Sequence, residues 1–325
     1  PVTIIEAVNQ ALFEELRRDP DVFVMGEDIG KRGGVFRATQ GLIEEFGATR
    51  IIDTPLAESS IAGIAMGAAM SGMRPIAEIQ FADFIWPAMN QIVGEAARVR
   101  YGTYGKLSVP MVVRTPYGGQ VRGGLFHSQS VEAYFAHTPG LKVIAPSTPY
   151  DAKGLLKASI RDDDPVIFLE HKRTYRSVRG ELPDSDYILP IGVADVKRQG
   201  NDATIITYGL TVHYSIQAAD VLLKENKTVE VIDLRSLKPL DMDTVLSSVN
   251  KTNRVLIVHE DNLSLGVGAE VSARIVEMAF SDLDAPVIRC TGPDIPAMPF
   301  APTLEAEFMP TTEKIVESLR KLLEY

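Results

Sequence analysis

The chain has 325 residues, of which 45% are hydrophobic, and a formal net charge of −10 at pH 7. This length is sufficient for two domains with buried cores. The acidic excess argues against broad binding to nucleic acids or anionic membranes, because such binding requires a basic surface. We therefore expect small molecules and proteins as partners.

Cys290 is the one cysteine, which excludes an intrachain disulfide and is typical of a reducing compartment. Its apolar neighbours predict a place in a strand core and no role as a nucleophile. The sequence has no apolar run of about 20 residues and no basic-then-apolar leader. We expect a cytoplasmic protein, or one of the mitochondrial matrix if a targeting segment has been removed.

The first part of the chain alternates β-rich runs with helical patterns. A capping box at Thr3 and Glu6 predicts an N-terminal helix. Alternation of this kind predicts a parallel sheet covered by helices, and hence an α/β fold. Strands are expected at 22–25, 74–80, 110–114, 141–144 and 165–169, and helices near 87–100 and 150–160.

Charged, proline-containing sequence predicts a linker at 181–200, between a domain at 1–180 and a second at 201–325. The second domain is also predicted to be doubly wound α/β. Its proline-rich segment 292–302 is too apolar for a free loop and is expected to lie across another surface. Strands are predicted at 203–208, 229–234, 254–259 and 286–290, and helices at 212–224, 241–249, 268–280 and 311–323.

Glu58 is the most suggestive carboxylate, because it opens a run of small and apolar residues up to Gly72. A helix of this composition is expected to be buried against other elements. Desolvation raises the pKa of a carboxyl group, whereas a helix N-terminus favours its ionised form. Glu58 is therefore either a poised proton donor or acceptor, or an exposed helix cap.

Two further strand ends carry polar groups. The run Gln80-Phe-Ala-Asp-Phe-Ile-Trp86 could stack on a planar ligand or act as a hydrophobic staple over the next helix. His127 follows a glycine-rich loop after a strand, where α/β active sites lie; the alternative is an ordinary surface imidazole. We expect Glu58, this aromatic run and His127 to share a pocket that another chain completes.

Other polar residues suggest less. Glu27 and Asp28 are expected to be solvated or salt-bridged, and His171 to face solvent. The glycine-rich segments lack the third glycine of a dinucleotide fingerprint and the Gly-Lys-Ser/Thr of a phosphate loop. A pairing of Ser128 or Ser130 with histidine lacks the Gly-x-Ser-x-Gly elbow of serine hydrolases.

Several motifs are more specific than these patterns. They are Gly26-Glu-Asp-Ile-Gly30, Gly33-Gly-Val-Phe-Arg37, Asp53-Thr-Pro-Leu-Ala-Glu58, Glu78-Ile-Gln-Phe-Ala-Asp83, His127-Ser-Gln-Ser130, Pro146-Ser-Thr-Pro-Tyr-Asp-Ala-Lys-Gly-Leu-Leu156 and Asp163-Asp-Pro-Val-Ile-Phe-Leu-Glu170. Together they resemble the β subunit of the thiamine-diphosphate-dependent 2-oxo acid dehydrogenases. The resemblance covers essentially the whole chain.

This resemblance implies a thiamine pyrimidine-binding domain followed by a transketolase C-terminal-like domain, in an α2β2 heterotetramer with the cofactor at the α/β interface. By motif match, Glu58 would hydrogen-bond the aminopyrimidine of thiamine diphosphate and promote its imino tautomer. His127 would lie near the reaction intermediate and the incoming lipoyl group. Leu56, Gln80 and Phe84 match cofactor-facing positions.

The Gly-Asp-Gly…Asn motif that holds Mg²⁺ and the diphosphate in thiamine enzymes is missing from the chain. The resemblance therefore implies that the α subunit supplies the residues that bind Mg²⁺ and the diphosphate. It also implies that this chain is active only together with the α subunit. The acyl product would pass to a lipoyl domain of the acyltransferase component, whose peripheral-subunit-binding domain is a further expected partner. The resemblance also implies a structural potassium ion, bound by carbonyls after a strand and near Ser159, Asp162 and Asp164, although this segment matches the family only in part.

The expected reaction is oxidative decarboxylation of branched-chain 2-oxo acids with reductive acylation of lipoyl groups. The Gln80 and His127 motifs resemble branched-chain enzymes more than pyruvate enzymes, although Phe84 replaces a tyrosine found in some branched-chain relatives. The alternatives are a pyruvate or acetoin dehydrogenase β subunit, a self-sufficient transketolase-like enzyme, and a non-catalytic assembly or docking subunit.

Overall fold

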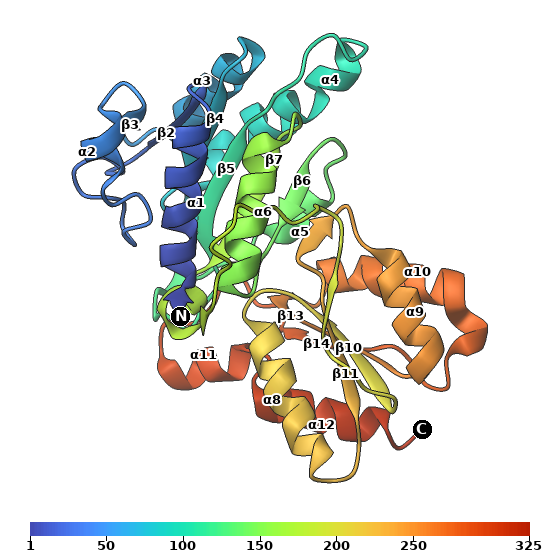
Figure 1. The fold of residues 1–325 in the computed structure, drawn as a ribbon. Helices are drawn as coiled ribbons and strands as arrows, with labels where there is room; N and C mark the ends of the chain where they lie inside the picture. Colours follow the sequence, from blue (N-terminus) through green and yellow to red (C-terminus); the bar gives the residue numbers. More distant parts are fainter. The chain divides into compact units, whose positions relative to one another are not determined.

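The computed structural model describes residues 1–325, which form two compact units. Unit 1 comprises Pro1–Tyr117 and Tyr134–Ile191, and unit 2 comprises Gly118–Ala133 and Gly192–Tyr325. Both are built from a sheet and helices (Figure 1). The segment Gly118–Ala133, which follows a strand of unit 1 in the sequence, thus packs as part of unit 2.

The sheet of unit 1 is parallel, as the sequence predicts. Its strands lie in the order β6-β7-β5-β4-β2-β3. Residues of β2, β5 and β7 are buried throughout, which is typical of parallel strands covered on both faces. The strands are β2 (Val22–Gly26), β3 (Ile51–Asp53), β4 (Arg74–Glu78), β5 (Val112–Tyr117), β6 (Lys142–Ile144) and β7 (Val166–His171); a separate antiparallel pair joins β1 (Val2–Thr3) and β8 (Arg179–Gly180).

Helix α1 (Ile4–Arg18) begins at the capping box expected from the sequence. The Thr3 amide donates to Glu6 Oε2 at 2.7 Å, and the Glu6 amide donates to Thr3 Oγ1 at 3.3 Å. The helix packs beside α6 (Pro149–Arg161) against the sheet (Figure 1). Their shared core contains Val8, Leu12, Leu16, Leu155, Leu156 and Ile160.

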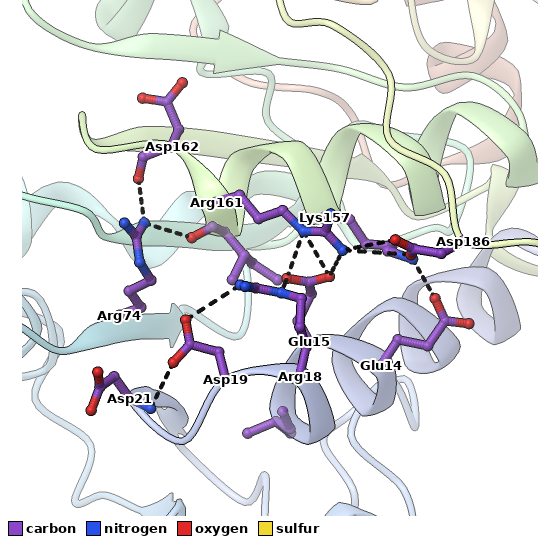
Figure 2. Close-up of polar contacts among 12 residues, drawn as sticks. Glu14, Glu15, Arg18, Asp19, Asp21, Arg74, Lys157, Arg161, Asp162 and Asp186 are labelled. Carbon is purple, nitrogen blue, oxygen red and sulfur yellow. Dashed lines mark hydrogen bonds and ion pairs between the residues drawn. The ribbon is translucent and has the colours of Figure 1, made fainter.

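Ion pairs line the seam between these two helices (Figure 2). Lys157 Nζ lies 2.5 Å from Glu14 Oε2 and also binds Asp186, and Arg161 lies 2.6 Å from Glu15. Burial alone would lower the pKa of Lys157, but its hydrogen bonds to Asp186 and Glu14 outweigh burial and raise it. The lysine therefore stays charged although its side chain is fully buried.

Two helix predictions in unit 1 need correction. Helix α3 (Glu58–Met70) is buried on one face only, because Ser60, Ile64, Gly67 and Met70 are exposed in this chain. The continuous helix expected at 87–100 is instead a series of 3-10 and π turns that ends in α4 (Val99–Gly102). The shorter helices of the unit are α2 (Leu42–Phe46), α5 (Glu132–Ala136), which begins in unit 2, and α7 (Thr174–Ser177).

Unit 2 has a five-stranded sheet in the order β14-β13-β10-β11-β9, in which only β9 is antiparallel to its neighbour. Helices cover both faces of this sheet, with α8 beside α12 and α9 beside α10 (Figure 1). None of the helices of the chain has the length and apolar character needed to cross a membrane. The elements are β9 (Asp195–Arg198), β10 (Ala203–Thr207), α8 (Thr211–Leu223), β11 (Val229–Asp233), β12 (Ser236–Lys238), α9 (Met242–Thr252), β13 (Val255–Asn262), α10 (Val267–Ala279), β14 (Ile288–Gly292), α11 (Pro302–Phe308) and α12 (Thr312–Leu322).

Candidate active site

Glu58 is the first residue of α3 and is buried, with 8% of its surface exposed, so the reading as an exposed cap is wrong. The neighbouring Glu27 follows β2 directly and is equally buried. Burial raises the pKa of Glu27, and the charges of Glu58 and Asp28 raise it further. No basic group offsets these contributions to the Glu27 pKa, so the Glu27 carboxylate can accept hydrogen bonds from a ligand.

Glu27, which was expected to be solvated or salt-bridged, is instead buried and is a candidate site residue. The available signal was its position at the carboxyl end of a fully buried parallel strand, where α/β sites form. Asp28 does pair with a basic residue, since Arg32 Nη1 lies 3.1 Å from its Oδ2. Gln80 lies in the same neighbourhood, because its Nε2 is 3.5 Å from the carbonyl oxygen of Glu27.

The loop between β3 and α3 adds an unsatisfied polar group. The hydroxyl of Thr54 is buried and has no hydrogen-bond partner within the chain, while its amide donates to the Gly26 carbonyl at 2.9 Å. Leu56, two residues on, is 79% exposed. A buried hydroxyl without a partner destabilises the free chain unless a ligand or water supplies one.

Four aromatic rings of unit 1 pack in a continuous series that includes Phe81, the residue after Gln80. Phe84 packs edge-on against Phe81, with ring centroids 5.6 Å apart, and Phe81 packs edge-on against Phe36 at the same distance. Phe36 in turn contacts Tyr175 at 5.2 Å. Phe84 thus has a fixed, partly exposed position that suits contact with a flat ring.

A buried ion network joins three adjacent strands of unit 1. The Arg114 guanidinium binds Glu170 through Nε at 2.6 Å and Nη2 at 2.8 Å, and binds Glu78 through Nη1 at 2.7 Å. The Tyr175 hydroxyl donates to Glu170 at 2.6 Å. Burial raises the pKa of Glu78, and the Arg114 charge opposes this shift. The network thereby ties Arg114 within β5 to the last residue of β4 and to Glu170 near the end of β7.

His127 lies in unit 2, on the loop Gly118–Ala133, which we call the histidine loop. It is half-buried and follows a 3-10 turn over Gly124–Phe126. Positive φ angles at Gln120 (60°), Arg122 (57°) and Gly124 (60°) give the loop its path. The pocket expected to join His127 with Glu58 and the aromatic run stays a prediction.

His171 does not face solvent as expected. It is only 1% exposed, its Nδ1 accepts the Arg173 amide at 3.2 Å, and its ring packs edge-on against Tyr117. Its position at the end of β7 places it in the core of unit 1. The imidazole is therefore part of the packing and not a surface group.

The three residues expected near a potassium ion already have partners. Both carboxylate oxygens of Asp162 lie within 2.7 Å of Lys142 Nζ. The Asp162 carbonyl accepts from Arg74 at 2.9 Å, as Figure 2 shows. Asp164 pairs with Arg100, and Ser159 Oγ donates to the Leu155 carbonyl at 2.7 Å. These side chains are therefore not free to bind a cation, and no cluster of metal-binding side chains is found elsewhere in the chain. The potassium site itself, which was expected to use backbone carbonyls, stays a prediction.

Two family matches cover most of the chain. Residues 1–178 match "Transketolase, pyrimidine binding domain", and residues 192–315 match "Transketolase, C-terminal domain". A solved structure described as "Split gene transketolase, inactive beta4 tetramer" has a TM-score of 0.81 over 99% of this chain and 98% of that chain. At 23% sequence identity, this likeness shows the shared fold.

Curated relatives align along the full length. The chain is 57% identical to the 2-oxoisovalerate dehydrogenase subunit beta of Bacillus subtilis (strain 168) over 324 residues, covering 100% of this chain and 99% of the relative. Over the same coverage it is 48% identical to the pyruvate dehydrogenase E1 component subunit beta of that strain and 46% identical to that of Staphylococcus epidermidis. The chain therefore belongs to the β subunits of the thiamine-diphosphate-dependent 2-oxo acid dehydrogenases.

Proposed function

We propose that this chain is the β subunit of a branched-chain 2-oxo acid dehydrogenase, which decarboxylates 2-oxoisovalerate and its homologues and acylates lipoyl groups. The observation that carries the proposal is the 57% identity to a 2-oxoisovalerate dehydrogenase subunit beta over the full length. The pyruvate dehydrogenase subunits reach 46–48% and make pyruvate the second candidate substrate. An α subunit would complete the α2β2 enzyme and bind the diphosphate with Mg²⁺.

The residues of unit 1 fit the pyrimidine end of thiamine diphosphate. The buried carboxylates of Glu27 and Glu58 can accept hydrogen bonds from a nitrogen heterocycle, and the free Thr54 hydroxyl offers one more polar contact. Phe84 and the exposed Leu56 supply apolar surface for a flat ring. When bound, the cofactor supplies the carbon nucleophile that attacks the 2-oxo acid and stores the electrons left when carbon dioxide departs.

Three residues of this chain have separate roles in the proposed reaction. Glu58 holds the proton shared with a ring nitrogen of the pyrimidine, and Gln80 helps to orient the ring from the adjoining strand end. The His127 imidazole donates a proton to the lipoyl sulfur that is not acylated when the dithiolane opens. Proton transfer by a positioned side chain typically contributes about 100-fold to 10,000-fold in rate.

The first test is Glu58→Gln in the enzyme reconstituted with its α subunit. The amide keeps the size of the side chain but cannot share a proton in the same way, so we expect decarboxylation to fall at least about 100-fold while assembly is unchanged. Glu44→Gln, on the exposed helix α2, is the matched control and should retain full activity. Wild-type turnover of Glu58→Gln would refute the proposed role.

The second test separates the substrate and subunit alternatives. The reconstituted enzyme should turn over 2-oxoisovalerate and 4-methyl-2-oxopentanoate faster than pyruvate, and equal turnover would contradict the branched-chain assignment. The isolated chain should show no tight binding of thiamine diphosphate in calorimetry. Tight binding there would instead favour a self-sufficient transketolase-like enzyme.

A further inference from the structure

The proline-rich segment expected to lie across a surface does so within unit 2. We call residues 293–308, which include α11, the C-terminal strap. Its residues Met298 and Phe308 are buried together with Leu210 and Met309, and Tyr214 of α8 packs against this cluster. The strap is thus held to unit 2 by this small apolar cluster.

The strap contacts the start of the histidine loop. The backbone amide of Gln120 donates to Glu305 Oε1 at 2.7 Å. The Tyr214 hydroxyl donates to the side-chain oxygen Oε1 of Gln120. Glu305 is only 6% exposed although it is a carboxylate. Gln120 has a φ of 60°, a strained conformation for a residue other than glycine, so its two partners hold the backbone in a path that it would otherwise leave.

The strap also contacts the remainder of the loop. The Met298 amide donates to Gln129 Oε1 at 3.3 Å, and Gly119 lies so close to Met298 that a β-carbon would overlap its sulfur. Phe300 covers Gly124, where a β-carbon would lie 3.2 Å from the ring. These contacts fall on both sides of His127 along the chain.

Residues of β13 and of the segment after β10 also hold the histidine loop. The Gly119 amide donates to Glu260 Oε1 at 2.5 Å, and the Tyr208 hydroxyl donates to Glu132 Oε1 at 2.9 Å. The two ends of the loop are therefore fixed to β13 and to the residue after β10. The strap adds the constraints nearest to His127.

We propose that the C-terminal strap positions His127 for acyl transfer, with Glu305 as the main positioning residue. The inference rests on the proposed function, because it assumes that the imidazole serves the lipoyl step. Glu305 acts through the Gln120 backbone and not on a reacting atom. Loss of its acceptor frees Gln120 to leave the positive φ region and moves the histidine without removing it.

The test compares two partial reactions of the reconstituted α2β2 enzyme. Decarboxylation is measured with ferricyanide as the electron acceptor, and reductive acylation with an isolated lipoyl domain. We expect Glu305→Ala to lower the kcat of reductive acylation by about 10-fold or more, since small displacements of a catalytic group have effects of this size. The ferricyanide rate should stay within about twofold of wild type, because that assay omits the lipoyl step.

Matched variants distinguish positioning from general damage. Glu305→Gln keeps an oxygen that can accept the Gln120 amide and should restore most of the acylation rate. Glu307→Ala changes the exposed carboxylate of the same helix and should behave as wild type. Tyr214→Phe removes only the hydroxyl that binds Gln120 and should lower acylation selectively, which keeps the proposal testable if Glu305→Ala does not fold.

Several results would overturn the proposal. One is a wild-type acylation rate in Glu305→Ala. If Glu305→Ala does not fold, a wild-type acylation rate in Tyr214→Phe has the same meaning. Another is an equal loss of rate in both partial reactions. If His127→Ala abolishes acylation while the strap variants do not affect it, only the strap proposal fails. If His127→Ala has no effect on acylation, both the role of His127 and its positioning are refuted.

Discussion

At the scale of single residues, burial changes what a charged group can do. Glu58 and Glu27 are both buried, and no basic group offsets the raised pKa of Glu27, which leaves its carboxylate available to a ligand. Arg114 is also buried, but two carboxylates and their hydrogen bonds satisfy it. Buried carboxylates therefore form a candidate site at Glu27 and Glu58. At Glu78 and Glu170 they form an ion network with Arg114, which we call the structural brace.

Removing the charge of this brace should destabilise unit 1 strongly. Arg114→Met leaves Glu78 and Glu170 buried without their cation, which typically costs about 3–5 kcal/mol. Arg17→Met is the control, because the Arg17–Glu45 pair is exposed and such pairs contribute about 0–1 kcal/mol. Urea denaturation of both variants measures the difference, and similar losses in the two would contradict the assignment.

At the scale of elements, two glycines in helices have opposite surroundings. A β-carbon at Gly154 in α6 would lie 2.7 Å from Leu189 and 2.8 Å from Tyr187, whereas one at Gly67 in α3 would meet no atom within 4 Å. Gly67 also belongs to the exposed face of α3 with Ile64 and Met70. That face is open in this chain.

The two alanine substitutions should therefore differ in sign. Gly67→Ala should stabilise the isolated chain by about 0.5–1 kcal/mol through a lower backbone entropy of the unfolded state. Gly154→Ala should destabilise it, because overpacking costs about 1–3 kcal/mol and exceeds that gain. Thermal unfolding of the isolated chain measures the stability of both variants. A stabilised Gly154→Ala variant would show that Leu189 and Tyr187 move aside at little energetic cost.

At the scale of the whole molecule, buried carboxyl groups should make stability depend on pH. Burial raises the pKa of Asp261 in unit 2 to about 6, and burial together with the Asp261 charge raises that of Glu132 well above its ordinary value. A carboxyl group whose pKa is higher in the folded state stabilises the fold at low pH. This contribution is lost as the pH rises through the folded-state pKa.

Asp261→Asn removes this carboxyl group together with its effect on Glu132. Relative to the variant, the wild type should lose free energy of unfolding as the pH rises from about 4 to about 7, because its unfolded chain ionises first. Urea denaturation of the isolated chain at a series of pH values gives the difference. Parallel stability curves for the two proteins would show that Asp261 does not titrate as inferred.

The sequence by itself determined the class of the fold and the local elements that depend on periodicity and capping. The alternation of apolar runs predicts the parallel sheets, and Thr3 with Glu6 predicts the start of α1, because these signals are local. The motifs around Glu58 and His127 also identify the family without any coordinates. Their proposed roles rest on that resemblance.

Only the tertiary structure decided which groups are buried and what lies beside them. Glu27 becomes the neighbour of Glu58, His171 is placed in the core, and the residues around Asp162 pair with Lys142 and Arg74. The strap contacts the histidine loop across about 185 residues of sequence, as the bond from Gln120 to Glu305 shows. Such contacts depend on long-range packing, which periodicity and local propensity do not encode.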